Sequence, residues 1–139
     1  VEKLIVDIAK HVYNFAGGTG CDIDKVQVRC KDFWFNIAEP GAYQEFHQHN
    51  DSHYSAVFYV KCKKDSGNIV FKDLRSFSDL QIIPAMNADH IRYYCPEETQ
   101  LLIFKSYLPH MVRKNQTDED RISFAANYVI ENNERSNHN

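Results

Sequence analysis

The spacing of apolar residues predicts one amphipathic helix at the start of the chain. In residues 2–16 the apolar side chains recur at helical intervals, with charged residues between them. Two glycines at positions 17 and 18 then supply a stop signal for the helix. The apolar positions that define the predicted helical face are Leu4, Ile5, Ile8, Ala9, Val12 and Phe15.

After this helix the pattern changes to short runs of aromatic and β-branched residues, which are separated by turn-forming Gly, Pro, Asn and Asp. Many short strands at such spacing are typical of a β-sandwich or barrel. We therefore expect an all-β-dominated fold, a cupin-like jelly roll with the N-terminal α-helix packed on one sheet. The predicted strands are residues 26–37, 43–49, 54–62, 68–71, 80–83, 90–94, 100–104, 110–113 and 121–130.

The length of 139 residues is sufficient for one domain with a substantial core. We assign residues 1–131 to a single jelly-roll domain and the polar residues 132–139 to a flexible C-terminal tail. The first residue is Val1 and not Met, so the sequence leaves open whether other residues precede it.

Charge and cysteine content exclude several classes of protein. The formal net charge is −3, with acids and bases interspersed, so the chain has no strong nucleic-acid signature. Its four cysteines form no CxxC pair, and we interpret them as reduced thiols. The sequence contains neither a run of about 18 apolar residues nor the residue order of a signal peptide. We therefore expect no membrane association and a cytoplasmic location.

The densest run of potential metal ligands lies in residues 43–59. His47 and His49 are separated by one residue in a predicted strand, where alternate side chains point to the same face. His110, in a distant predicted strand, would complete three facial ligands and leave the other coordination positions open for chemistry. Asp51 continues the same alternation and stays open as a carboxylate ligand. A half-buried hairpin rich in Tyr and His is the alternative to a metal site.

Three motifs, taken in order, resemble the Fe(II)- and 2-oxoglutarate-dependent dioxygenases, in particular a small branch known from phages and marine bacteria. The motifs are GAYQEFHQHNDSHYSAVFYV at 41–60, SGNIVFKDLR at 66–75, and QLLIFKSYLPHMV followed by RISFAANY between 100 and 128. Together they cover most of the chain after residue 33. The resemblance implies a double-stranded β-helix, a jelly roll, which agrees with the strand pattern.

The resemblance also implies roles for the histidines. His47 matches the first metal ligand of the family and His110 the distal histidine. His49 stands where most of the superfamily has a carboxylate ligand, although the small branch often has histidine there. We therefore expect His49 as the third ligand in preference to Asp51.

Five further residues match positions that bind the cosubstrate or line its cavity. Arg121 matches the arginine that pairs with the distal carboxylate of 2-oxoglutarate, and Tyr59 matches a tyrosine whose hydroxyl binds the same carboxylate. Ser123 follows on the same side of the strand as Arg121 and could also bond the cosubstrate. Asn36 and Asn127 fit the family pattern as polar cavity residues. The alternatives are a surface arginine, a core tyrosine and solvated amides.

The function that the resemblance implies is hydroxylation of a substrate with Fe(II) and 2-oxoglutarate as cofactors and release of succinate and CO2. The place of action would be the cytoplasm of a bacterial or phage-infected host cell. No motif identifies the substrate, a small molecule or a peptide, or settles whether the protein is a homodimer. We expect loops at 73–80 and 84–99 to border the cavity mouth. The rival interpretation is a cupin-type metal enzyme or small-molecule-binding jelly-roll module without 2-oxoglutarate, which would not need Arg121.

Overall fold

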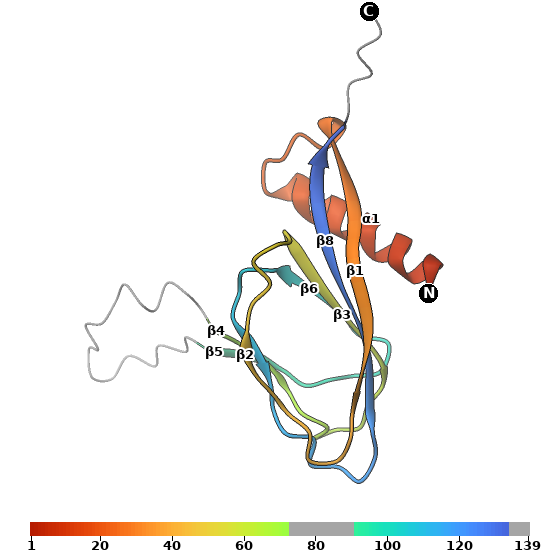
Figure 1. Cartoon of the computed structure of the whole chain (residues 1–139), viewed down its shortest axis with the longest axis vertical. Helices are drawn as coiled ribbons and strands as arrows, with labels where there is room; N and C mark the ends of the chain where they lie inside the picture. The colour runs from red at the N-terminus through yellow and green to blue at the C-terminus, as the bar shows by residue number, and fades with distance from the viewer. Residues whose placement is uncertain (73–90, 134–139) are drawn as a thin grey trace, which may run out of the picture.

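The computed structural model describes residues 1–72 and 91–133, which form two four-stranded antiparallel sheets and an N-terminal helix (Figure 1). A short 3-10 helix connects the N-terminal helix to the first strand. In chain order the elements are α1 (Glu2–Gly18), η1 (Ile23–Lys25), β1 (Val26–Ala38), β2 (Gln44–His47), β3 (Tyr54–Lys61), β4 (Ile69–Lys72), β5 (Ile91–Tyr94), β6 (Leu101–Lys105), β7 (His110–Val112) and β8 (Arg121–Asn132).

The strand order brings distant parts of the chain together. The first sheet has the order β1-β8-β3-β6, and the second has the order β2-β7-β4-β5. All the neighbouring strands pair antiparallel. Helix α1 packs on the first sheet, where it lies across β1 and β8 (Figure 1). The predicted all-β-dominated jelly roll with one N-terminal α-helix is therefore confirmed.

Two of the observed strands differ in length from the predicted ones. The strand predicted at 43–49 is shorter, since β2 ends at His47. The residues that follow include Asn, Asp and Ser, which favour turns over strands. Strand β8 continues to Asn132, where we placed the start of the tail, because it stays paired with the first residue of β1. The strand predicted at 80–83 lies outside the described residues.

Helix α1 supplies three of the eight buried residues of the main core, Ile8, Val12 and Ala16. Its buried face includes Ile8 and Val12, which pack against Phe124 and Tyr128 of β8. The Tyr128 hydroxyl also donates a hydrogen bond of 3.0 Å to the backbone carbonyl of Ile5. Apolar burial and this hydrogen bond together hold the helix against β8 of the first sheet. None of the helices in the described residues has the length and apolarity needed to cross a membrane.

Strand β8 serves the core and the cavity at once, because side chains alternate between the two faces of a strand. Phe124 and Tyr128 face α1 and are fully buried. Arg121, Ser123 and Asn127 lie on the opposite face and line a cavity that residues of both sheets enclose. The hydrophobic contact with α1 therefore fixes the position of the polar cavity wall.

The packing of α1 can be tested with two positions on the same helix. Replacing Ile8, which is 1% exposed, with Ala should lower the free energy of unfolding by about 2–5 kcal/mol, because a cavity opens under the helix. Val6 is 52% exposed, so the matched control Val6→Ala should change this free energy by less than about 0.5 kcal/mol. Urea unfolding measures both, and equal losses would contradict the packing described.

Candidate metal centre

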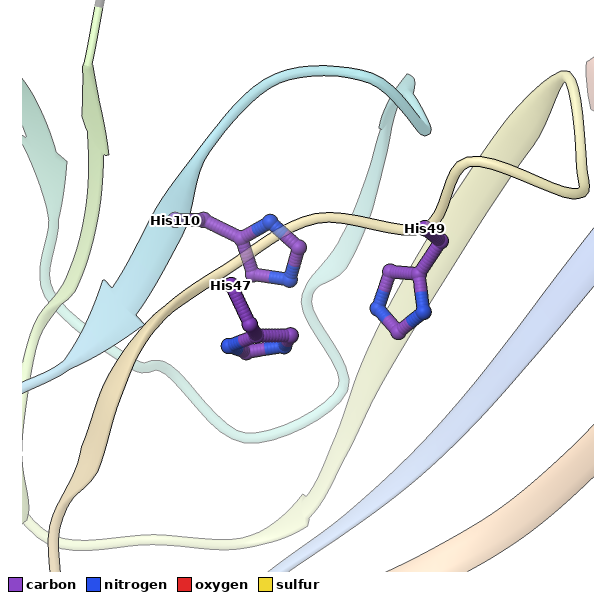
Figure 2. A group of neighbouring side chains, drawn as sticks. All are labelled: His47, His49 and His110. Carbon is purple, nitrogen blue, oxygen red and sulfur yellow. The ribbon is translucent and has the colours of Figure 1, made fainter.

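Three histidines from two strands and a loop gather beside the cavity. His47 ends β2, His110 begins β7, and His49 lies two residues beyond the end of β2. Their three potential ligand nitrogens lie within 4.8 Å of one another. The ring centroids are 4.1 Å apart for His47 and His110, 5.2 Å for His47 and His49, and 5.3 Å for His49 and His110. Figure 2 shows the three rings turned towards a common space.

The register of the second sheet creates the first pair. His47 and His110 are direct partners across β2 and β7, so their side chains start close together. The Nδ1 atom of His47 lies 2.9 Å from the backbone carbonyl of Glu45, and that of His110 lies 2.9 Å from the carbonyl of Leu108. A carbonyl oxygen only accepts, so each Nδ1 carries the proton. Both Nε2 lone pairs are therefore free to ligate a metal.

His49 reaches the cluster by a different route from the one that strand alternation predicted. That part of the prediction was wrong, because β2 ends at His47 and His49 lies in the loop that follows. The backbone N–H of His49 donates a 2.9 Å hydrogen bond to the carbonyl of Ser106. Its ring lies 6.0 Å from the Trp34 ring, measured between centroids. A backbone bond to Ser106 and a ring contact with Trp34 of β1, and not the alternation of β2, therefore position the third imidazole.

Burial favours the neutral form of two of the imidazoles. His110 is 4% exposed, and desolvation lowers its pKa to about 4, although the Leu108 carbonyl favours the proton. The pKa of His49 is also lowered, first by burial and then by the nearby His47. Neutral imidazole is the ligating form, and imidazole nitrogen suits iron among other divalent metals. The donor set therefore fits a divalent cation such as Fe(II).

The nearby carboxylates do not join the cluster. The side chain of Asp51 is 67% exposed and forms an ion pair with Lys31. Glu45 contacts His47 through its backbone carbonyl and not through its carboxylate. The cluster in the described residues thus consists of imidazoles alone.

A cavity of about 290 Å³ lies beside the histidines, close to the lower end of the roughly 300–1,000 Å³ range of small-ligand sites. Its described lining contains no Asp or Glu, and its one charged side chain is a guanidinium. It brings together all the residues that the sequence suggested for the cosubstrate and cavity wall: Asn36, Tyr59, Arg121, Ser123 and Asn127.

The loops that we expected at the cavity mouth lie largely outside the described residues, since the structure describes neither 73–80 nor 84–90. Beyond that segment, Tyr93 and Tyr94 are exposed on β5 and do not line the cavity. The exposed Tyr43 does line it.

Arg121 is a buried cation without an acidic partner in the described parts of the chain. It is 6% exposed, and its Nη1 donates to the backbone carbonyls of Ser66, at 2.7 Å, and Gly67, at 3.2 Å. Desolvation lowers its pKa, and electrostatic interaction with Tyr59 acts in the opposite direction. Leaving a buried charge unpaired is costly, and a guanidinium matches a carboxylate in geometry. Arg121 is therefore suited to binding the carboxylate of a ligand.

Two neighbours shape the space around this guanidinium. Gly67 has φ +108°, and a Cβ atom there would lie 2.2 Å from the Arg113 carbonyl and 2.7 Å from Nη1 of Arg121. Only glycine lets the guanidinium lie against this turn. Tyr59 is 2% exposed, and burial raises its pKa to about 12, so its hydroxyl keeps its proton and can donate.

Sequence reasoning missed three residues that support the site. Trp34 donates from Nε1 to the Oδ1 atom of Asn36 at 3.2 Å. Asn115 is 1% exposed and donates to two backbone carbonyls, at 2.9 and 2.8 Å, and so shapes the loop that leads to Arg121. Ser106 binds the backbone of the loop that carries the third histidine. A lone tryptophan in a strand and an asparagine in a turn were weak signals, and Ser106 gave none.

Comparison with known families gives a match over most of the chain. A model of the family described as "Putative 2OG-Fe(II) oxygenase" matches residues 32–127. This range contains all three histidines and the buried Arg121. A search of curated protein sequences finds no match to the chain.

Solved structures share the fold at low sequence identity. A 2OG-Fe(II) oxygenase-family oxidoreductase from Burkholderia pseudomallei is 15% identical, with a TM-score of 0.61 over 83% of this chain and 50% of that one. A Pseudomonas putida prolyl-4-hydroxylase is 20% identical, with a TM-score of 0.52 over 84% and 59%. HygX from Streptomyces hygroscopicus, solved with nickel and 2-oxoglutarate bound, is 13% identical, with a TM-score of 0.53 over 73% and 57%. The chain thus spans about half the length of these proteins.

The geometry predicts which of two residues is the third ligand. Replacing His49 with Ala should weaken Co(II) binding by about 100-fold or more, since even groups outside the ligand shell change metal affinity 10–100-fold. Asp51→Ala should change it by less than about threefold, because Asp51 pairs with Lys31 away from the cluster. Calorimetric titration with Co(II) measures both, and the reverse order would make Asp51 the ligand.

The lowered pKa of His110 predicts a pH-dependent stability of the metal-free protein. In the unfolded chain a histidine takes up a proton near its ordinary pKa of about 6.5, whereas folded His110 does so only at about 4. Between these values the unfolded state binds the additional proton, so the free energy of unfolding falls as the pH is lowered from about 6.5 to about 4.

Urea unfolding at about pH 7.5 and about pH 5 measures this dependence. The variant His110→Gln should lose part of the fall, whereas His11→Gln, at an exposed position of α1, should keep it. If the stability of His110→Gln fell with pH as much as that of the wild-type protein, the assignment of this dependence to His110 would be contradicted.

Proposed function

The chain belongs to the 2OG-Fe(II) oxygenase family, whose cofactors are Fe(II) and 2-oxoglutarate, and from this premise we propose that it is a dioxygenase of the hydroxylase type. It would hydroxylate a small molecule or peptide and release succinate and CO2. The observation that carries the proposal is the buried guanidinium of Arg121, which has no acidic partner in residues 1–72 and 91–133 and lies in the same cavity as three convergent imidazoles. A metal ligand set and a carboxylate site in one cavity are what a metal-chelating dicarboxylate needs.

The three histidines would hold Fe(II). His47 and His110 present Nε2 because backbone carbonyls occupy both Nδ1 protons. His49 would supply the third imidazole nitrogen, and a site with only three protein ligands leaves coordination positions for other molecules. Bound Fe(II) supplies the redox chemistry that couples decarboxylation of 2-oxoglutarate to oxidation of the substrate.

Arg121 and its neighbours would bind the distal carboxylate of 2-oxoglutarate. The guanidinium provides charge, and the protonated hydroxyl of Tyr59 provides a further donor. Ser123 is two residues from Arg121 on the same face of β8 and lines the same cavity. Because Arg121 and Tyr59 are almost completely buried, little water competes for the carboxylate there.

Part of the cavity wall is apolar. Val57, Ile69, Phe104 and Val112 line it, and the Phe104 ring lies 4.8 Å from the His110 ring between centroids. Such a wall excludes water from the metal face and strengthens the electrostatic interactions inside the cavity. The protein would therefore contribute orientation and a dry environment to the reaction.

A second candidate function is a cupin-type metal enzyme, or a small-molecule-binding jelly-roll module, that does not use 2-oxoglutarate. The observation in its favour is the all-histidine cluster, which lacks the carboxylate that most of the superfamily has. This alternative leaves the buried charge of Arg121 without a role, so we favour the dioxygenase.

We also infer that the protein acts in the reducing cytoplasm of a bacterial or phage-infected host cell. The four cysteines are unpaired in the structure, which is compatible with a reducing compartment. The phage or marine origin rests on the sequence resemblance alone.

The test of this function uses Fe(II)-loaded protein under air. Wild-type protein should convert 2-oxoglutarate to succinate slowly even without substrate, and His110→Ala should not. Arg121→Gln should raise the KM for 2-oxoglutarate about 30-fold or more, since removing one partner of a buried charge pair costs about 2–5 kcal/mol.

The cosubstrate analogue 2-oxopentanoate lacks the distal carboxylate, so Arg121→Gln should leave its weak turnover unchanged. Arg29, which is exposed and pairs with Glu131, supplies the matched control Arg29→Gln. Equal losses with both oxo acids would argue against the carboxylate site. Metal binding without any consumption of 2-oxoglutarate would favour the cupin-type alternative.

A further inference from the structure

The turn that joins β6 to β7, residues 106–109, holds two of the three histidines. The carbonyl of Ser106 accepts the backbone N–H of His49 at 2.9 Å. The carbonyl of Leu108 accepts the Nδ1 proton of His110 at 2.9 Å. One short turn therefore sets the position of one ligand and the ring orientation of another.

The side chain of Ser106 extends this role into the interior. It is fully buried, and its hydroxyl lies 3.0 Å from that of Ser52 and 2.9 Å from that of Ser55. The Ser55 hydroxyl in turn donates to Oδ1 of Asn127 at 2.7 Å. This chain of hydroxyls joins the His49 loop, the 106–109 turn, β3 and β8.

The chain of hydroxyls has a direction, because each serine hydroxyl has one proton to donate. Ser55 gives its proton to Asn127, so it must accept from Ser106. Ser106 then accepts from Ser52, in agreement with the observed geometry. The Oδ1 atom of Asn127 is thereby occupied. Its Nδ2 protons have no partner in residues 1–72 and 91–133, so they are available to a ligand in the cavity that Asn127 lines.

His49 needs such support more than the other two histidines do. His47 and His110 lie in paired strands, whose backbone ladder fixes the direction of each side chain. His49 lies in a loop, which is joined to the 106–109 turn by the backbone bond from His49 to Ser106 and by the hydroxyl bond from Ser52 to Ser106.

We propose that Ser106 is a positioning residue that fixes the loop-borne ligand His49 and, through Ser55, the amide of Asn127. The loop that carries His49 and the cavity-lining amide of Asn127 are then held by one series of side-chain hydrogen bonds. Two points rest on the proposed function: which metal is bound, and that the ligand of Asn127 is 2-oxoglutarate. The coupling itself rests on the contacts of Ser106.

The hydroxyl chain has one arm through Ser52 to the His49 loop and another through Ser55 to Asn127. Measuring two dissociation constants separates these two arms. Co(II) binding is titrated without 2-oxoglutarate, and 2-oxoglutarate binding is titrated on the Co(II)-loaded protein. Ser52→Ala should raise the Co(II) constant about tenfold and leave the 2-oxoglutarate constant unchanged, because Ser106 still donates to Ser55. Ser55→Ala should raise the 2-oxoglutarate constant and leave the Co(II) constant unchanged, because it removes the hydrogen bond to Asn127 but keeps the bond between Ser52 and Ser106. Ser106→Ala should raise both.

Two controls distinguish positioning from a general loss of structure. Ser55→Thr keeps the hydroxyl and should retain the wild-type affinity for 2-oxoglutarate. Thr19→Ala removes a hydroxyl that donates at 2.7 Å to the carbonyl of Ala16, at the end of α1, and should leave both constants unchanged. Thermal unfolding establishes that each variant is folded, and Ser106→Cys, a weaker donor of similar shape, replaces Ser106→Ala if the latter does not fold.

The outcomes separate this inference from the proposed function. If Ser52→Ala and Ser55→Ala change both constants equally, or change neither, the directional chain is overturned. If the wild-type protein binds no Co(II), the metal centre fails, and the proposed function fails with it. If Co(II) binds but 2-oxoglutarate does not, the arm through Asn127 is overturned, and the arm through Ser52 is still tested by the first constant.

Discussion

The antiparallel pairing of β2 with β7 is the constraint on which the rest of the cavity depends. Its register places His47 directly opposite His110, with the ring centroids 4.1 Å apart. A slip of one strand by one residue would turn its imidazole to the other face of the second sheet and separate it from the other histidine. The third histidine, the apolar wall and the buried arginine are all arranged around this one pair. The packing of α1 against β8 matters to the site because β8 carries the arginine on its opposite face.

The charge of the cavity explains what it is suited to bind. Its described lining offers three imidazoles and one guanidinium but no carboxylate. A divalent cation and Arg121 together bring three positive charges, and 2-oxoglutarate brings two negative ones. The loaded site would therefore keep one positive charge, whereas a site with a carboxylate ligand would be neutral. This difference should affect the affinity for the metal and the electrostatic preference for the substrate.

Much of this arrangement could be predicted from the sequence, and the exceptions have a common physical cause. Residue periodicity predicted α1 and most of the strands, because local pattern follows from burial on one face. His47 and His110 followed from a motif and from strand positions. The structure brings His49 into the histidine cluster, but through a loop and not through the predicted strand, since β2 ends two residues before it. Ser106 acts through contacts with residues far away in the chain, and Trp34 acts through one side-chain hydrogen bond. Such contacts leave no periodic signal in a single sequence.

The most direct test of the central claim is the anaerobic addition of 2-oxoglutarate to the Fe(II)-loaded protein, followed by visible absorption. An oxo acid that chelates Fe(II) through its keto oxygen and adjacent carboxylate gives a weak charge-transfer band, whereas succinate cannot form that chelate. We expect a band that saturates at one equivalent of 2-oxoglutarate and is absent with succinate. Stoichiometric binding of Fe(II) without any such band would contradict the central claim, because the histidine cluster would then hold a metal that 2-oxoglutarate does not reach.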